Sequence, residues 1–142
     1  MVQYRARRRR AIVTVMDTHF PWIAIIDDEE PVRRALLRLL RSAGLQGRAF
    51  ASGAEFFAEL AVSWPYCVVL DLHMPGMSGF DVLAHLQLVA PEIGVIVATG
   101  QHSAENEARV RRHRPLAYLR KPVDDQQLLD AIQAARAGMA ND

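Results

Sequence analysis

The sequence contains very little cysteine and no long apolar run. Cys67 is the only cysteine in 142 residues, so the chain can form neither an internal disulfide nor a metal cluster of cysteine ligands. No apolar run approaches the roughly 18 residues that a membrane-spanning helix needs, and residues 11–16 are too short for a signal-peptide core. We therefore expect a cytoplasmic protein that does not associate with a membrane.

Lysine is almost absent as well. The chain has 17 basic residues, of which 16 are arginine, and the single lysine is Lys121. A compact, strongly hydrated ammonium group is therefore present at one position only, whereas guanidinium groups are spread along the chain. Lys121 is therefore distinct from every other basic residue of the chain.

Acidic residues are missing from the first part of the chain. Residues 1–16 carry five arginines and no acid, and a short basic arm of this kind can attract nucleic acid or anionic lipid. The alternatives are a disordered tail, or an over-long start in which Met16 is the true initiator. We predict a basic, flexible arm at residues 1–21, one domain at residues 22–137 and a short tail at residues 138–142.

Short apolar runs alternate with amphipathic stretches from residue 22 onward, which is typical of repeated strand–helix units and a parallel sheet. The predicted strands are residues 22–26, 47–50, 67–70, 95–98 and 117–119. The first, third and fourth are continuously apolar, as strands covered on both faces must be, so we place them at the sheet centre. We predict an α/β fold, a flavodoxin-like (βα)5 doubly wound parallel sheet with strand order 2-1-3-4-5.

Helix signals fall between these strands. Pro31 opens the first helix, Gly44 lies at its end, and Ser52 with Glu55 three residues later reads as a capping box. The later helices are predicted to start at Ser78 or Gly79, at Ser103 or Ala104, and at Asp124 or Asp125.

Chemically reactive side chains follow the predicted strands. Asp27 and Asp28 come after the first, Asp71 ends the third, Thr99 ends the fourth and Lys121 follows the fifth. In an open parallel sheet these carboxyl ends meet at one edge, where ligands bind. Three carboxylates together repel one another unless a cation lies among them, and all-oxygen ligands favour Mg²⁺, or Mn²⁺. The sequence therefore predicts a divalent-metal site, with Asp27 as an outer ligand through water.

The same residues can accept a phosphoryl group. A carboxylate can attack a phosphorylated donor in line, while an ammonium and a hydroxyl neutralise the transferring group. We predict Asp71 as the nucleophile, Lys121 as the partner of the phosphoryl oxygens and Thr99 as the hydroxyl donor.

Four segments in order carry a resemblance. They are IDDE at residues 26–29, LDLHMPGMSG at residues 70–79, ATG at residues 98–100 and YLRKP at residues 118–122. Together they resemble the receiver domain of response regulators in two-component signal transduction, over about residues 22–137. The resemblance implies a phospho-acceptor switch rather than an enzyme, with only self-catalysed phosphoryl transfer and dephosphorylation.

Further expectations rest on that resemblance alone. It implies that a histidine kinase or a histidine phosphotransfer protein phosphorylates Asp71, that the backbone carbonyl of His73 completes the metal shell, and that the Lys121–Pro122 peptide is cis. It also implies that Thr99 moves toward the phosphoryl group while Tyr118 rotates inward. The surface of the last two helices and last strand then changes to control an unknown downstream protein or a phosphorylation-dependent homodimer.

Some positions depart from the family pattern or are specific to this chain. Residues 112–116 stand where the family usually has a Gly-Ala pair. Without that glycine, the sequence does not predict where the preceding helix ends. The nearby arginines form either a basic docking face or a solvated helix side: Arg109, Arg111, Arg112 and Arg114. His73 and Gln101, each two residues past a site residue, are expected to tune the rate at which water removes the phosphoryl group.

Other functions remain as alternatives. An aspartate-nucleophile phosphatase resembling the haloacid dehalogenases normally has an aspartate two residues after the nucleophile, where this chain has His73. A pseudo-receiver scaffold would not need the acids, the threonine and the lysine together. We do not expect direct nucleic-acid binding or an output domain, because no helix-turn-helix region follows residue 137.

Overall fold

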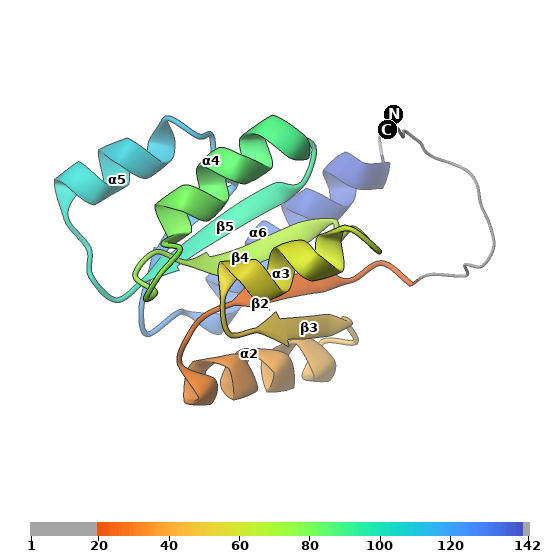
Figure 1. Ribbon diagram of the computed structural model, residues 1–142. Helices are drawn as coiled ribbons and strands as arrows, with labels where there is room; N and C mark the ends of the chain where they lie inside the picture. The colour runs from red at the N-terminus through yellow and green to blue at the C-terminus, as the bar shows by residue number, and fades with distance from the viewer. Residues whose placement is uncertain (1–19, 141–142) are drawn as a thin grey trace.

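The computed structural model describes residues 20–140, in which strands and helices alternate (Figure 1). The strands are β2 (Ile23–Ile26), β3 (Gly47–Phe50), β4 (Cys67–Asp71), β5 (Gly94–Thr99) and β6 (Ala117–Arg120). The helices are α2 (Glu30–Ser42), α3 (Gly53–Leu60), α4 (Gly79–Val89), α5 (Ala104–Arg111) and α6 (Asp125–Ala140). The basic arm predicted at the N-terminus falls mostly outside the described residues.

The five described strands form one parallel sheet in the order β3-β2-β4-β5-β6. This is the predicted order 2-1-3-4-5, which is therefore confirmed. The three apolar runs lie at the centre as expected: β2 and β4 are buried throughout, and β5 is buried after its first residue. The edge strands β3 and β6 are only half-buried.

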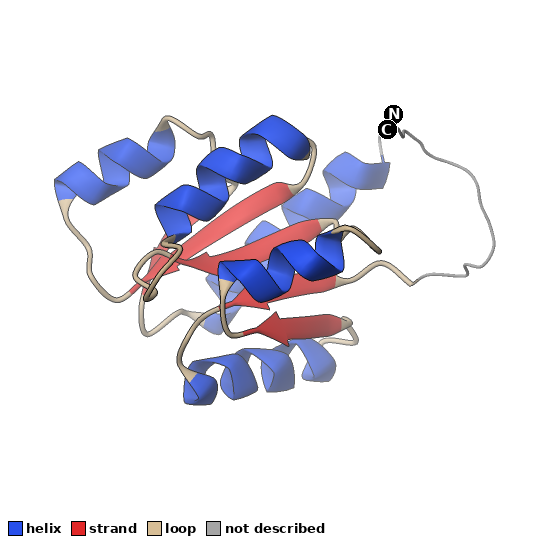
Figure 2. Cartoon of the chain, viewed as in Figure 1, coloured by secondary structure: helices blue, strands red, loops and turns tan. Residues whose placement is uncertain are grey.

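Helices cover both faces of the sheet, which gives three layers (Figures 1 and 2). The helices α3, α4 and α5 contribute to one apolar cluster, which includes Phe56, Leu83 and Val110. The helices α2 and α6 close the other face, where Leu40 and Leu128 pack against the central strands. With both faces of the sheet covered, the ends of the central strands are where the loops gather and where ligands bind in open parallel sheets.

Serine caps start three of the helices. The hydroxyls of Ser52, Ser78 and Ser103 each accept a hydrogen bond from the backbone N–H three residues later. The complete capping box is at Ser78, because the Asp81 carboxylate accepts the N–H of Ser78 in return. At Ser52 only half of the expected box forms, since the Glu55 carboxylate accepts from the N–H of Ala51 instead.

The ends of α5 and α6 complete the described fold. The last helix, α6, continues to Ala140 and so passes residue 137, the predicted boundary between domain and tail. Where α5 turns into β6, Arg114 takes up a left-handed conformation with φ of 53°, the conformation that the absent glycine would supply. Among the described residues, no helix has the length and apolar character needed to cross a membrane.

Candidate functional site

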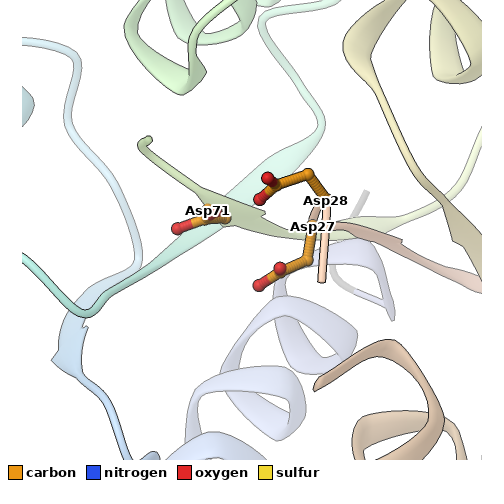
Figure 3. Close-up of side chains that lie close together, drawn as sticks. All are labelled: Asp27, Asp28 and Asp71. Atoms are coloured by element: carbon orange, nitrogen blue, oxygen red, sulfur yellow. The ribbon is translucent and has the colours of Figure 1, made fainter. Parts of the chain in front are cut away.

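Three carboxylates gather at the carboxyl edge of the sheet (Figure 3). Asp27 and Asp28 follow β2, Asp71 ends β4, and each offers an oxygen within 4.8 Å of the oxygens of the others. Asp27 is 3% exposed and Asp71 is 6% exposed, whereas Asp28 is exposed. Two of the three negative charges are therefore held away from solvent.

Strand register explains why these residues meet. Ile26 of β2 is paired with Leu70 of β4, so the residues that follow, Asp27 and Asp71, lie side by side. On the other side of β4, Asp71 is paired with Ala98, which directly precedes Thr99. Thr99 is in turn paired with Arg120 of β6, the residue before Lys121. Parallel pairing thus brings four separate chain segments to one edge.

Lys121 lies among the carboxylates. Its Nζ is 2.7 Å from Oδ2 of Asp27 and 3.4 Å from Oδ1 of Asp71, and 3.7 Å from Oε1 of the exposed Glu29. Burial acts to lower the pKa of Lys121, but the hydrogen bond and the charge of Asp27, with that of Asp71, outweigh burial and raise the pKa above its ordinary value. The ammonium is therefore firmly charged.

The surroundings of Asp71 disfavour its charged form. Burial, reinforced by the negative charge of Asp27, raises the pKa of Asp71 from 3.8 to about 6, although Lys121 and the backbone N–H of His73 act to lower it. One ammonium does not offset the crowding. The donor set fits a hard divalent cation: three carboxylate oxygen donors lie close together, and their repulsion is what such a cation relieves.

The hydroxyl group of Thr99, the predicted donor to the phosphoryl group, lies at the same carboxyl edge of the sheet. Thr99 is 1% exposed, and its Oγ1 accepts a hydrogen bond of 3.0 Å from the backbone N–H of Gln101. Its carbonyl accepts the N–H of Lys121 at 2.8 Å, and the Lys121–Pro122 peptide is cis as expected. The backbone of β5 therefore positions the start of the loop that carries the lysine.

Gly79 permits the loop after β4 to fold back on that strand. A Cβ at this position would overlap the carbonyl oxygen of Asp71 and the Cα of Leu72. The N–H of Gly79 donates to the carbonyl of Leu72 at 2.9 Å, which closes the loop. Any side chain here would displace the backbone of Asp71 itself.

The residues predicted around the phosphoryl position have different surroundings. His73 is half-buried, its ring lies edge-on to Phe80, and its Nδ1 is buried with no hydrogen-bond partner among the described residues. Tyr118 is half-buried, and its hydroxyl lies 3.1 Å from Nδ1 of His102. Gln101 is exposed in the loop between β5 and α5.

Sequence reasoning missed three residues that touch the site or Tyr118. Glu29 approaches Lys121, and Arg33 donates from Nη1 to the carbonyl of Asp27 at 2.8 Å. Their signal was weak but present, since both lie within one turn of the start of α2, directly after the acidic pair. His102 bonds Tyr118 across 16 positions of sequence, and only the pairing of β5 with β6 brings the two together.

The arginines of α5 are partly engaged within the domain. The guanidinium of Arg109 stacks on the Phe80 ring at 3.9 Å, and Nη2 of Arg111 lies 3.1 Å from a carboxylate oxygen of Glu107. Arg109 and Arg111 thus have contacts within the domain, whereas Arg112 and Arg114 are exposed, and whether the four form a docking face or a solvated helix side stays a prediction.

One cavity among the described residues lies far from the carboxylates. It measures about 560 Å³ and is lined by Trp22, Tyr66 and Leu116 among others, at the amino edge of the sheet. The chemically reactive side chains lie at the opposite, carboxyl edge, where three of them are buried by the sheet itself. We therefore assign the functional site to the carboxyl edge, where these side chains meet, rather than to the cavity.

A sequence model described as the response regulator receiver domain matches residues 23–133. The chain belongs to this family. The receiver domain is 34% identical over 113 residues to nodulation protein W of Bradyrhizobium diazoefficiens, a match that covers 80% of this chain and 50% of that protein. It is 32% identical over 113 residues to the transcriptional regulatory protein FixJ of Azorhizobium caulinodans, covering 80% of this chain and 54% of FixJ. The chain spans about half the length of these relatives.

Solved structures agree with the family. The signal receiver domain of an HD domain-containing protein from Pseudomonas fluorescens Pf-5 superposes with a TM-score of 0.81 and 26% identity, covering 87% of this chain and 100% of that chain. A response regulator receiver protein from Pseudomonas putida gives a TM-score of 0.77 and 25% identity, covering 80% and 96%. The predicted family and fold are therefore confirmed.

Proposed function

We propose that this receiver domain is a phosphorylation switch in which a histidine kinase or a histidine phosphotransfer protein phosphorylates Asp71. The observation that carries the proposal is the position of Lys121, whose Nζ lies 3.4 Å from Oδ1 of Asp71 and 2.7 Å from Oδ2 of Asp27. An ammonium beside a buried carboxylate is placed to neutralise the oxygens of an incoming phosphoryl group.

The chain's own residues supply most of the chemistry. An oxygen of Asp71 attacks the phosphorus, and the new O–P bond forms as the bond to the donor nitrogen breaks, with its electron pair leaving on that nitrogen. Lys121 binds a phosphoryl oxygen through its ammonium. The backbone N–H of Gln101 donates to Oγ1 of Thr99. The hydroxyl hydrogen of Thr99 is therefore left to be donated to another phosphoryl oxygen.

Asp28 and Asp71 would hold Mg²⁺, or Mn²⁺, directly, with Asp27 acting through water and the carbonyl of His73 completing the shell. When bound, the cation offsets the charge of the carboxylates and of the transferring group. The closeness of the three aspartate oxygens and the raised pKa of Asp71 support this assignment. The exposure of Asp28 keeps one side of the cluster open to the donor.

The output of the switch is proposed to be a changed surface on α5, β6 and α6. Thr99 follows the phosphoryl group, Tyr118 rotates inward, and a downstream protein or a second copy of the domain binds the new surface. Linkage requires that a partner which prefers this surface also favours phosphorylation. Arg112 and Arg114, both exposed, are proposed to favour an acidic partner.

Phosphodonor labelling tests the proposal. The chain is incubated with acetyl phosphate and Mg²⁺, and an adduct that is stable in acid and labile in base is expected. The adduct should vanish in Asp71→Asn and persist in Asp130→Asn, a control on the exposed face of α6. Steady turnover of phosphorylated metabolites would favour the phosphatase alternative, and the absence of both adduct and Mg²⁺ binding would leave a scaffold.

A further inference from the structure

The loop between β5 and α5 holds Tyr118 through His102. Nδ1 of His102 lies 3.1 Å from the Tyr118 hydroxyl, and the two rings meet in a tilted edge contact with centroids 5.6 Å apart. Both residues are half-buried, so the hydrogen bond is partly shielded from water. His102 is therefore the polar contact that fixes the outer end of the Tyr118 side chain.

The neighbours of His102 keep it in place. Ser103 caps α5 by accepting the N–H of Asn106 at 3.0 Å, and Nδ2 of Asn106 donates to the carbonyl of Gln101 at 3.1 Å. His102 lies between these two anchored residues. Because the residues on both sides of His102 are anchored, little backbone freedom is lost when the His102 side chain bonds Tyr118.

The same loop also binds Thr99. The N–H of Gln101 donates to Oγ1 of Thr99 at 3.0 Å, and the next residue is His102. Adjacent residues of one short loop thus bind the two side chains that are proposed to move on phosphorylation. A shift of Thr99 that moved Gln101 would therefore act on the residue that contacts Tyr118.

We propose that His102 is a positioning residue for Tyr118, whose hydrogen bond holds the tyrosine in the orientation of this structure and opposes the switch. The proposal rests on the phosphorylation switch described above and assigns its restraint to this loop. Rotation of Tyr118 inward removes its hydroxyl from His102, so the phosphorylated form has to break this bond. A net hydrogen bond of ordinary strength corresponds to about a fivefold bias toward the resting orientation.

Beryllofluoride binding with Mg²⁺ measures that bias. His102→Ala is expected to raise the apparent affinity for the phosphoryl mimic about fivefold, because the bond no longer favours the resting form. His102→Asn, whose amide can take the place of Nδ1, is expected to restore the wild-type value. The matched control is His113→Ala, which removes a histidine bonded to Gln87 on the surface and should leave the affinity unchanged.

A double-mutant cycle separates positioning from simple damage to the loop. Tyr118→Phe removes only the hydroxyl that bonds His102. If this bond carries the effect, the double variant should have the same apparent affinity for beryllofluoride as either single variant. Independent, additive effects would overturn the proposal. So would an affinity in His102→Ala equal to that of His113→Ala.

A measurement without metal or phosphodonor keeps this inference distinct from the proposed function. Three-bond NMR couplings report the χ1 rotamer of Tyr118 in the unmodified protein. We expect one dominant χ1 rotamer of Tyr118 in the wild-type protein. In His102→Ala the couplings should be averaged over several rotamers, and in His102→Asn the single dominant rotamer should return. An unchanged rotamer in His102→Ala would overturn the role of His102 whether or not Asp71 is phosphorylated. A failure of labelling alone would overturn only the proposed function.

Discussion

Lys121 and Asp27 are 94 positions apart in the sequence, yet Nζ of the lysine lies 2.7 Å from Oδ2 of the aspartate. The pair joins the loop after β2 to the loop after β6, across the width of β4 and β5. It places the only lysine of the chain between Asp27 and the proposed acceptor Asp71.

Removing the ammonium should destabilise the domain. Lys121→Met keeps most of the side-chain volume but leaves Asp27, with its side chain 4% exposed, without its charged partner. We expect a loss of about 2 kcal/mol in the free energy of unfolding, measured by urea denaturation at pH 7.5. Arg34→Met is the control, because its ion pair with Glu30 is exposed on both sides and should contribute almost nothing. Equal stability of the two variants would contradict the central place of Lys121.

Without metal, Asp71 should make the domain less stable as the pH rises. The pKa of Asp71 is about 6 in the folded protein against an ordinary value of 3.8, so the folded state holds the extra proton between these values. The free energy of unfolding should therefore fall between about pH 4 and pH 6 by roughly 3 kcal/mol relative to Asp71→Asn, and the difference should level off above pH 6. Urea titrations of both proteins in a chelator check this. Parallel pH profiles would contradict the crowding of charge in the site.

Mg²⁺ should stabilise the protein through Asp28. At about 100 times the dissociation constant, a bound ligand stabilises the folded state by about 2.7 kcal/mol. Asp28→Asn should leave the metal-free stability within about 0.5 kcal/mol of wild type, because Asp28 is exposed, and should abolish most of the Mg²⁺ effect. Glu92→Gln, an exposed acid at the amino edge of the sheet, is the control. Thermal unfolding with and without Mg²⁺ gives the comparison, and a full Mg²⁺ effect in Asp28→Asn would remove Asp28 from the ligand set.

A glycine at position 114, in the connection between α5 and β6, should stabilise the domain. Arg114 has φ of 53°, a conformation that costs a residue with a side chain about 1 kcal/mol. Arg114→Gly should therefore raise the free energy of unfolding by up to about 1 kcal/mol. Arg112→Gly, at the preceding C-cap with φ of −63°, should lower it instead. Chemical denaturation of the pair measures both signs, and a loss of stability in Arg114→Gly would contradict the conformation assigned to Arg114.

Much of this architecture could be predicted from local patterns. Three apolar runs identified the central strands, and the acids, the threonine and the lysine at strand ends identified one edge of a parallel sheet. Each of those signals is contained in a few neighbouring residues. The same runs placed three strands at the centre of the sheet, since only strands covered on both faces tolerate continuous apolar sequence, whereas the full strand order came from the flavodoxin-like arrangement that we predicted.

Features that depend on geometry between distant segments could not be predicted. The contact of His102 with Tyr118 requires the register that pairs Thr99 with Arg120. The left-handed Arg114 replaces an absent glycine at a conformational cost that no propensity indicates. The Glu55 carboxylate bonds the N–H of Ala51 rather than that of Ser52, a choice between adjacent donors that the capping pattern does not distinguish.

The most direct test of the account is to locate the phosphoryl group. After treatment with acetyl phosphate and Mg²⁺, reduction with borohydride converts a phosphorylated aspartate to homoserine, which peptide mass spectrometry then places in the sequence. We predict homoserine at Asp71 alone, and none without Mg²⁺. Homoserine at Asp27 or Asp28, or unmodified Asp71 in protein that binds Mg²⁺, would contradict the account.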